Sequence, residues 1–285
     1  MKKEWLGVAG ALALVPLLAA PQDPAPRFEV ASVKECQNTD LMPPSTSTPG
    51  RLSLHCWQLS RIIREAYDAY ASGKVNPLSP GLPTTPIEGL PAWANSSTYL
   101  IEAKPESPQV GAMMRGPMMQ ALLEERFHLK IHRETREVAA YIMTVAKGGL
   151  KLQPTPEGSC IPLDPTDLAQ PQTGSKPWCA APLILPRKGL FVLDVHGITL
   201  DVFSKLLNPG RPVIDRTNLT GAYDIHLEWE PDLPAAATPQ GAAVLDPGHS
   251  SAIEATRDQL GLRLDPGRGT REFLVIDHIE KLVGN

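Results

Sequence analysis

The sequence predicts an α+β protein made of two similar modules, each with the element order β-α-β-β-α-β-β. Segments whose apolar residues recur with helical spacing alternate with segments whose apolar residues recur at every second position. The same order of segments occurs twice, most clearly in the stretches 121–147 and 255–281. We therefore expect an internal repeat in which each module is a small, mostly antiparallel sheet with its helices on one face.

The first half begins with a predicted strand near Phe28 and continues with a helix over 59–70. A strand, a turn and a second strand around Tyr99 follow. A second helix is expected to begin at Pro117, because proline fits the first turn of a helix. The segment 128–147 is expected to form a hairpin that turns in its polar middle. The apolar faces of the two helices consist of Leu59, Ile62, Ile63, Ala66, Tyr67 and Tyr70, and of Met119, Leu122, Leu123 and Phe127.

The second half repeats this order, starting with a strand near Phe191 and a helix over 198–207. A strand, a turn and a second strand are then expected over 211–229, with the bend at Gly221. The inward face of the second strand consists of Tyr223, Ile225 and Leu227.

The last helix of the chain carries start and stop signals. Ser251 and Glu254 have the spacing of a capping box, in which side chains bond the free N–H groups of the first turn. Gly261 follows the last apolar position and is expected to end the helix. The closing hairpin is expected to turn through Pro266, Gly267 and Gly269.

The N-terminal segment 1–20 has the features of a secretory signal peptide. Lys2 and Lys3 precede an apolar run that ends at Ala20, and this run is shorter than the roughly 20 apolar residues of a spanning helix. We expect an exported protein, periplasmic or secreted, with no later membrane span. Retention of the segment as an anchor stays open. The net charge of −4 argues against nucleic-acid binding, which requires a basic face.

The four cysteines lie in pairs around two polar stretches of the chain. An even number of cysteines in an exported protein is typical of disulfides, and the bonds Cys36–Cys56 and Cys160–Cys179 are the simplest of three possible pairings. A four-cysteine zinc site is the alternative, but the C-x-x-C spacing is absent.

Proline is abundant, with 30 residues, and one proline-rich stretch separates the two predicted modules. Such a composition indicates a stiff excursion, and a disulfide within it indicates order. We therefore divide the chain into a signal peptide over 1–20, a first module over 27–150, an excursion over 151–189 and a second module over 190–285.

The sequence carries no motif of a serine hydrolase, a zinc peptidase, a phosphate-binding loop or a dinucleotide-binding fold. His128 and His132 are expected on the outward face of a strand, with a metal-binding pair as the alternative. Asp277 and His278 end an apolar strand, where adjacent side chains point to opposite faces and do not form a dyad. We therefore expect no catalytic residue, no cofactor and no metal ligand.

The segment 211–229 is rich in polar groups that resemble an active site. Because turns need side chains that bond the backbone, we interpret the polar residues over 215–218 as a turn. As candidates for a binding surface we retain Trp93, Trp178, Asp215, Arg216 and His278.

Five segments follow one another in a recognisable order. They are FEVASVK, GLPAWANSSTYLIEAK, LLEERFHLKIHRETREVAAYIMTVAKGGLKL, DRTNLTGAYDIHLEW and LVIDHIEK. With them the chain resembles a soil-associated family of exported bacterial proteins, abundant in acidobacteria and without an established function. One departure is Asn218, where the resemblance leads us to expect glycine. The resemblance implies an extracytoplasmic location and supplies no catalytic residues.

Each half is also similar, more distantly, to the short N-terminal domains of secretins and TonB-dependent receptors, which implies protein contacts rather than chemistry. We expect a non-catalytic module of the cell envelope that binds a protein or peptide through sheet edges or the excursion. The alternative is an envelope enzyme or a small-molecule binder whose site is the cleft between the modules.

Overall fold

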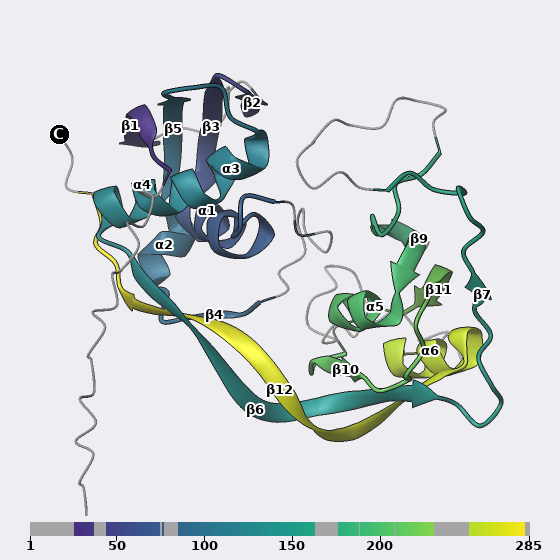
Figure 1. The fold of residues 1–285 in the computed structure, drawn as a ribbon. Coiled ribbons are helices and arrows are strands. Elements are labelled where there is room, and N and C mark those ends of the chain that lie inside the picture. Colours follow the sequence, from purple (N-terminus) through teal and green to yellow (C-terminus); the bar gives the residue numbers. More distant parts are fainter. Residues whose placement is uncertain are drawn as a thin grey trace, which may run out of the picture.

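The computed structural model describes residues 26–36, 44–74, 76, 85–162, 176–187, 189–207, 209–230 and 251–282. Two lobes share a long two-stranded ribbon, and the sheets are mostly antiparallel, as an α+β fold requires (Figure 1). The predicted signal peptide lies outside the described residues and stays a prediction. Within the described part, no helix is long and apolar enough to cross a membrane.

The first lobe contains a four-stranded antiparallel sheet covered by short helices. The strand order is β1 (Phe28–Glu35), β5 (Thr98–Pro105), β3 (Arg51–Gln58) and β2 (Thr46–Thr48). The helices are α1 (Leu59–Arg64), the π-helical turn η1 (Glu65–Ala69), α2 (Ala92–Ser96), α3 (Gly111–Arg115) and α4 (Pro117–Phe127).

The predicted apolar faces of both helices form the core of this lobe. All ten of the residues named for them are buried, and Tyr99 meets Phe127 edge to face with 5.0 Å between ring centroids. The helix α4 begins at Pro117, as predicted, and is capped by His128 with a φ of 48°. His128 therefore ends a helix, and its predicted position on a strand beside His132 is wrong.

The second lobe contains the sheet β7 (Gln153–Pro154), β11 (Ala222–Trp229), β9 (Leu190–Thr199) and β8 (Leu183–Arg187), in that order. The helices α5 (Leu200–Leu206) and α6 (Ala252–Leu260) accompany it. The inward face of β11 (Tyr223, Ile225 and Leu227) is buried, as predicted, and α5 buries Leu200 and Phe203. The capping box of Ser251 and Glu254 and the left-handed Gly261 are also confirmed.

The ribbon consists of β6 (Lys130–Val145) and β12 (Leu262–His278), which pair antiparallel along their whole length. Each strand also takes a short parallel partner from the other half of the chain. The strand β10 (Val213–Asp215) lies beside β6, and β4 (Ile87–Glu88) lies beside β12. The start of β12 packs in the core of the second lobe, and its end packs in the core of the first.

The two predicted closing hairpins are wrong, because each predicted pair of strands is a single continuous strand. A tight hairpin needs residues that adopt positive φ, and the polar middle of β6 has no glycine, asparagine or aspartate. In β12, Gly267 and Gly269 instead allow neighbouring isoleucine side chains to pack closely against the strand. A Cβ at Gly267 would lie 2.6 Å from Cγ1 of Ile142, and one at Gly269 would lie 2.6 Å from Cγ1 of Ile214.

Both predicted disulfides are present, Cys36–Cys56 and Cys160–Cys179. The second closes the base of the proline-rich excursion, where Ile161 also forms a bridge with Trp178. Because Cys179 in turn bridges His196 of β9, the described ends of the excursion are attached to the second lobe.

Replacing Gly269→Ala is expected to lower the free energy of unfolding by about 1–3 kcal/mol, because the new methyl group overpacks Ile214 and displaces β10 from β6. Thermal and urea unfolding measure the loss. The matched control is Gly50→Ala, which has no atom within 4 Å of the added Cβ. Equal stability of the two variants would contradict the close packing of β10 on the ribbon.

Candidate functional site

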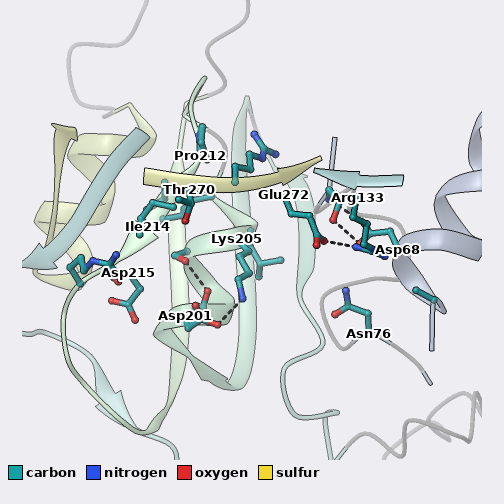
Figure 2. A pocket seen from close by; sticks show the side chains of 18 of the residues that line it. Asp68, Asn76, Arg133, Asp201, Lys205, Pro212, Ile214, Asp215, Thr270 and Glu272 are labelled. Atoms are coloured by element: carbon teal, nitrogen blue, oxygen red, sulfur yellow. Dashed lines mark hydrogen bonds and ion pairs between the residues drawn. The ribbon is translucent and has the colours of Figure 1, made fainter. Parts of the chain in front are cut away.

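A cleft with a volume of about 790 Å³ opens between the two lobes, and the ribbon forms its floor (Figure 2). In Figure 2, Thr270, Glu272 and Arg133 follow the ribbon, with Asp68 on one side and Asp201 on the other. The cleft therefore exists only because two halves of the chain are held apart by a shared pair of strands.

Hydrogen bonds within α5 and at its N-terminus fix the side chains of the cleft wall that the second lobe contributes. The Thr199 hydroxyl caps the helix by accepting from the Val202 N–H at 3.4 Å. One turn further on, Lys205 Nζ donates to Asp201 Oδ2 at 2.7 Å, and the buried Ser204 hydroxyl donates to the Asp201 carbonyl at 2.7 Å. This wall thus presents an ion pair whose members already satisfy each other.

The turn after β10 continues this wall. Asp215 Oδ1 accepts from the Thr217 N–H at 2.8 Å, and the Thr217 hydroxyl accepts from the Leu219 N–H at 3.3 Å. These bonds are those of the predicted turn. Asn218 has a φ of 57°, a left-handed conformation that explains why glycine suits this position. Asp215 and Arg216 also line the cleft, so this turn forms part of the cleft wall.

The floor is fixed to the first lobe by Arg133. Its guanidinium donates to the Glu272 carboxylate across the ribbon and to the Tyr67 carbonyl of η1. Nearby, Asp68 Oδ1 accepts from the Thr85 hydroxyl at 3.0 Å. Arg133 therefore joins the ribbon to the first lobe, and a separate hydrogen bond holds Asp68.

The charges of the cleft are unequally satisfied. Its lining contains the acidic residues Asp68, Asp201, Asp215 and Glu272 and the basic residues Lys74, Arg133, Lys205, Arg216 and Arg271. Each of the four carboxylates accepts a hydrogen bond from a donor of this chain. Within the described residues, Lys74, Arg216 and Arg271 have no carboxylate within ion-pair distance. Asp215 accepts only the neutral Thr217 N–H, so the lining combines charges of both signs with one more basic than acidic residue.

Arg271 differs from the other two because it is half-buried, whereas Lys74 and Arg216 are exposed. Burial lowers the pKa of its guanidinium, since removing water disfavours the charged form. It lies near the middle of β12, opposite Arg136 of β6, whose own guanidinium is bound by Glu88 at 2.7 Å and Glu134 at 2.6 Å.

Of the binding-surface candidates, the structure brings only Asp215 and Arg216 into the cleft. Trp93 packs half-buried on the core of the first lobe, and Trp178 lies beside the Cys160–Cys179 bond. His278 Nε2 contacts Glu280 Oε1 at 2.8 Å, outside the cleft. A cleft between the modules was the alternative site expected from the sequence, but most of its lining could not be identified, because that lining depends on the pairing of β6 with β12.

None of the histidines that the structure describes lines the cleft; His55 is largely buried and the others are exposed on the lobes. Glu280 contacts His128 at 3.0 Å as well as His278, and these imidazoles lower the pKa of its carboxyl. In the second lobe, His226 Nδ1 contacts Asp194 Oδ1 at 2.6 Å. Among the described residues, no three potential ligands are grouped so as to hold a metal ion.

The lining of the cleft, as far as the structure describes it, contains neither histidine nor cysteine. Its one buried hydroxyl, that of Ser204, donates to a backbone carbonyl and has no adjacent base. A nucleophile needs such a base to lose its proton. The arrangement can bind polar and charged groups, but it does not present a nucleophile paired with a base.

The fold and the cleft define a two-lobed α+β protein with a polar cleft of ligand size over a shared ribbon. The chain belongs to a family of proteins of unknown function, DUF3738, which matches residues 78–279. Those residues include the ribbon and most of the cleft. Neither a curated protein nor a solved structure matches the chain.

The surface pair of His226 and Asp194 is expected to make stability depend on pH. The hydrogen bond that the His226 imidazole donates to the Asp194 carboxylate raises the pKa of His226 above its ordinary 6.5. The resulting stabilisation is complete below that ordinary value and is lost as the pH rises through the raised one. His226→Gln should therefore destabilise more at about pH 5.5 than at about pH 8.5, by under about 1 kcal/mol because the pair is exposed.

Urea unfolding across this pH range measures the difference, with Lys34→Gln as the control for loss of an exposed cation. A stability loss that is the same at both ends of the range, or larger at the alkaline end, would contradict the assigned pairing.

Proposed function

We propose that this protein is an exported, non-catalytic binding protein of the cell envelope that takes a protein segment or peptide into the cleft between its lobes. The observation that carries the proposal is the cleft itself, whose lining combines both lobes and both ribbon strands. Two disulfides fit an oxidising compartment outside the cytoplasm. The predicted signal peptide agrees with that location.

A binding role is favoured over catalysis by the state of the polar groups. Four carboxylates are already bonded within the protein, and no histidine stands by to accept a proton in the described lining. An acid-base catalyst needs a group poised to exchange protons near neutral pH. The cleft instead offers fixed donors and acceptors around an open space.

A small molecule is the second candidate for the same cleft. Its volume of about 790 Å³ lies within the range of small-molecule sites. The walls differ in character, because the second lobe contributes apolar positions at Leu206, Pro212 and Ile214. This observation favours a compact ligand that has both an apolar and a polar part.

A sheet edge was the other predicted mode of binding. The edge strand β8 pairs only with β9 among the described strands, and it exposes about half of the side chains of Leu183 and Leu185. Pro186 lacks the N–H that an added strand would use, which weakens this edge as a docking site. The cleft is therefore the stronger candidate.

The proposal includes the internal repeat, with modules over 27–150 and 190–285. Its support is the register of the ribbon. The C-terminal caps of α4 and α6 are His128 and Gly261. The short strand β10 begins to pair at Tyr141 of β6, and β4 begins to pair at Leu274 of β12. The sequence separation within the first pair of residues equals that within the second. Glu137 pairs with Thr270, which has that spacing too. This common spacing supports a repeat in which a pseudo-twofold axis through the pair would relate the two halves.

The test fills the cleft with a bulky side chain. Thr270→Trp places an indole over the ribbon at an exposed position and should abolish ligand capture without unfolding the protein. The matched control is Lys130→Trp, which adds the same group to an exposed position of β6 outside the cleft. Captured ligands are identified by crosslinking in the native envelope and by mass spectrometry of co-purified small molecules.

The proposal expects a ligand that wild type and Lys130→Trp capture and Thr270→Trp does not. A peptide places the protein among envelope interaction modules, whereas a small molecule selects the second candidate. Capture that is equal in all three proteins would contradict the cleft as the site and point to the β8 edge. Hydrolysis of the captured ligand would contradict the non-catalytic role.

A further inference from the structure

The outer edge of β12 offers main-chain hydrogen-bond groups to the cleft. We propose that an extended peptide adds to this edge as a further strand, beside Arg268, Thr270 and Glu272, and exchanges main-chain hydrogen bonds with it. This inference rests on the proposed function, because it states how the ligand of the same cleft is held. It selects a peptide over a small molecule.

The direction of the main-chain groups follows from the register of the ribbon. The Leu274 N–H donates to the Pro86 carbonyl, so it points outward, away from β6. In an antiparallel pair, alternate residues direct their N–H and C=O groups at the partner strand and away from it. The register has no shift between Leu262 and Ile276, so the groups of Thr270 point outward in phase with those of Leu274.

Only part of this edge has a partner among the described residues. The strand β4 pairs with β12 only from Leu274 onward, and Pro266 towards the other end has no N–H to offer. Between them, no hydrogen bond within the described chain reaches the outward main-chain groups of Arg268, Thr270 and Glu272. These residues are exposed, and such a row of unpaired groups is a template for another chain.

The cleft reaches this edge of the ribbon. Thr270 and Glu272 line the cleft from one face of β12. Ile214 lines it too, and its side chain lies against Gly269, which faces the opposite way from Thr270. A space that touches both faces of a strand passes around its edge. The lining leaves out the outward residues in the middle of β6, which are Thr135, Glu137 and Ala139.

The fold already uses strand addition at both ends of the ribbon. The strand β4 adds to β12 and β10 adds to β6, each as a short parallel strand. An outward N–H of the ribbon, at Leu274 and at Tyr141, donates to the chain just before each added strand. A peptide beside Thr270 would continue the line of β4 along the same edge. Its ligand property is therefore an extended main chain, rather than one particular charge.

The probe is a displayed library of random heptapeptides, selected on the wild-type protein. A selected peptide is synthesised, and calorimetry measures its affinity for wild type, Thr270→Pro and the control Ala139→Pro. Thr270→Pro removes an outward N–H and keeps the bonds across the ribbon, as Pro266 does in the same strand. Ala139 is exposed, directs its N–H outward from β6, and does not line the cleft.

The expected result is equal affinity of the peptide for wild type and Ala139→Pro. Thr270→Pro should bind at least about tenfold more weakly, because one donor is lost and a peptide carbonyl is left without its partner. Failure to select any peptide, or unchanged affinity of Thr270→Pro, would overturn the inference.

A second measurement modifies the peptide and needs no variant of the protein. Each amide nitrogen of the selected peptide is methylated in turn, which removes one donor at a time. Strand addition predicts that binding is weakened at every second position and kept at those between, since alternate N–H groups point at β12 and away from it. A profile without this alternation contradicts the inference, whether or not Thr270→Pro folds.

Failure of the inference is distinguishable from failure of the proposed function. If native ligand capture is blocked by Thr270→Trp but is indifferent to Thr270→Pro, the cleft binds its ligand without strand addition, and only the inference is wrong. If capture is indifferent to both variants, the cleft is not the binding site at all.

Discussion

The antiparallel pairing of β6 with β12 is the interaction on which the rest of the structure depends. Its register runs from Lys130 opposite His278 to Val145 opposite Leu262, and each strand reaches both lobes. Both hydrophobic cores contain side chains of the ribbon, so neither lobe is complete without residues from the other half of the chain. Folding of the two lobes is therefore coupled through long-range contacts, which are slow to form.

The same pairing creates the cleft and determines its chemistry. Holding two lobes along one ribbon leaves a space above its middle, where few apolar groups are available to fill it. The polar side chains there are mostly bonded to one another, with Arg133 joining the ribbon to the first lobe. The exposed Thr270 and Glu272 share the ribbon face of Arg133, whereas Arg271 between them belongs to the opposite face with Arg136.

Local features could be predicted from the sequence because their causes are local. The capping box at Ser251 and Glu254, the helix start at Pro117 and the buried helix faces follow from short-range patterns, and both disulfides follow from cysteine order. The ribbon could not be predicted in this way, since a polar strand centre and a polar hairpin turn look alike in one sequence. The partner of β6 lies more than a hundred residues away, and the lining of the cleft depends on that partner.

A cysteine crosslink between the two halves tests the ribbon most directly. In the variant Glu137→Cys with Thr270→Cys, the account predicts a disulfide between the two new residues, identified by mass spectrometry of the unreduced digest, because they are paired across the centre of the ribbon. Lys130→Cys with Arg263→Cys, at opposite ends, should form none. Two local hairpins would keep Glu137 and Thr270 in separate turns, and absence of their crosslink in folded protein would contradict the account.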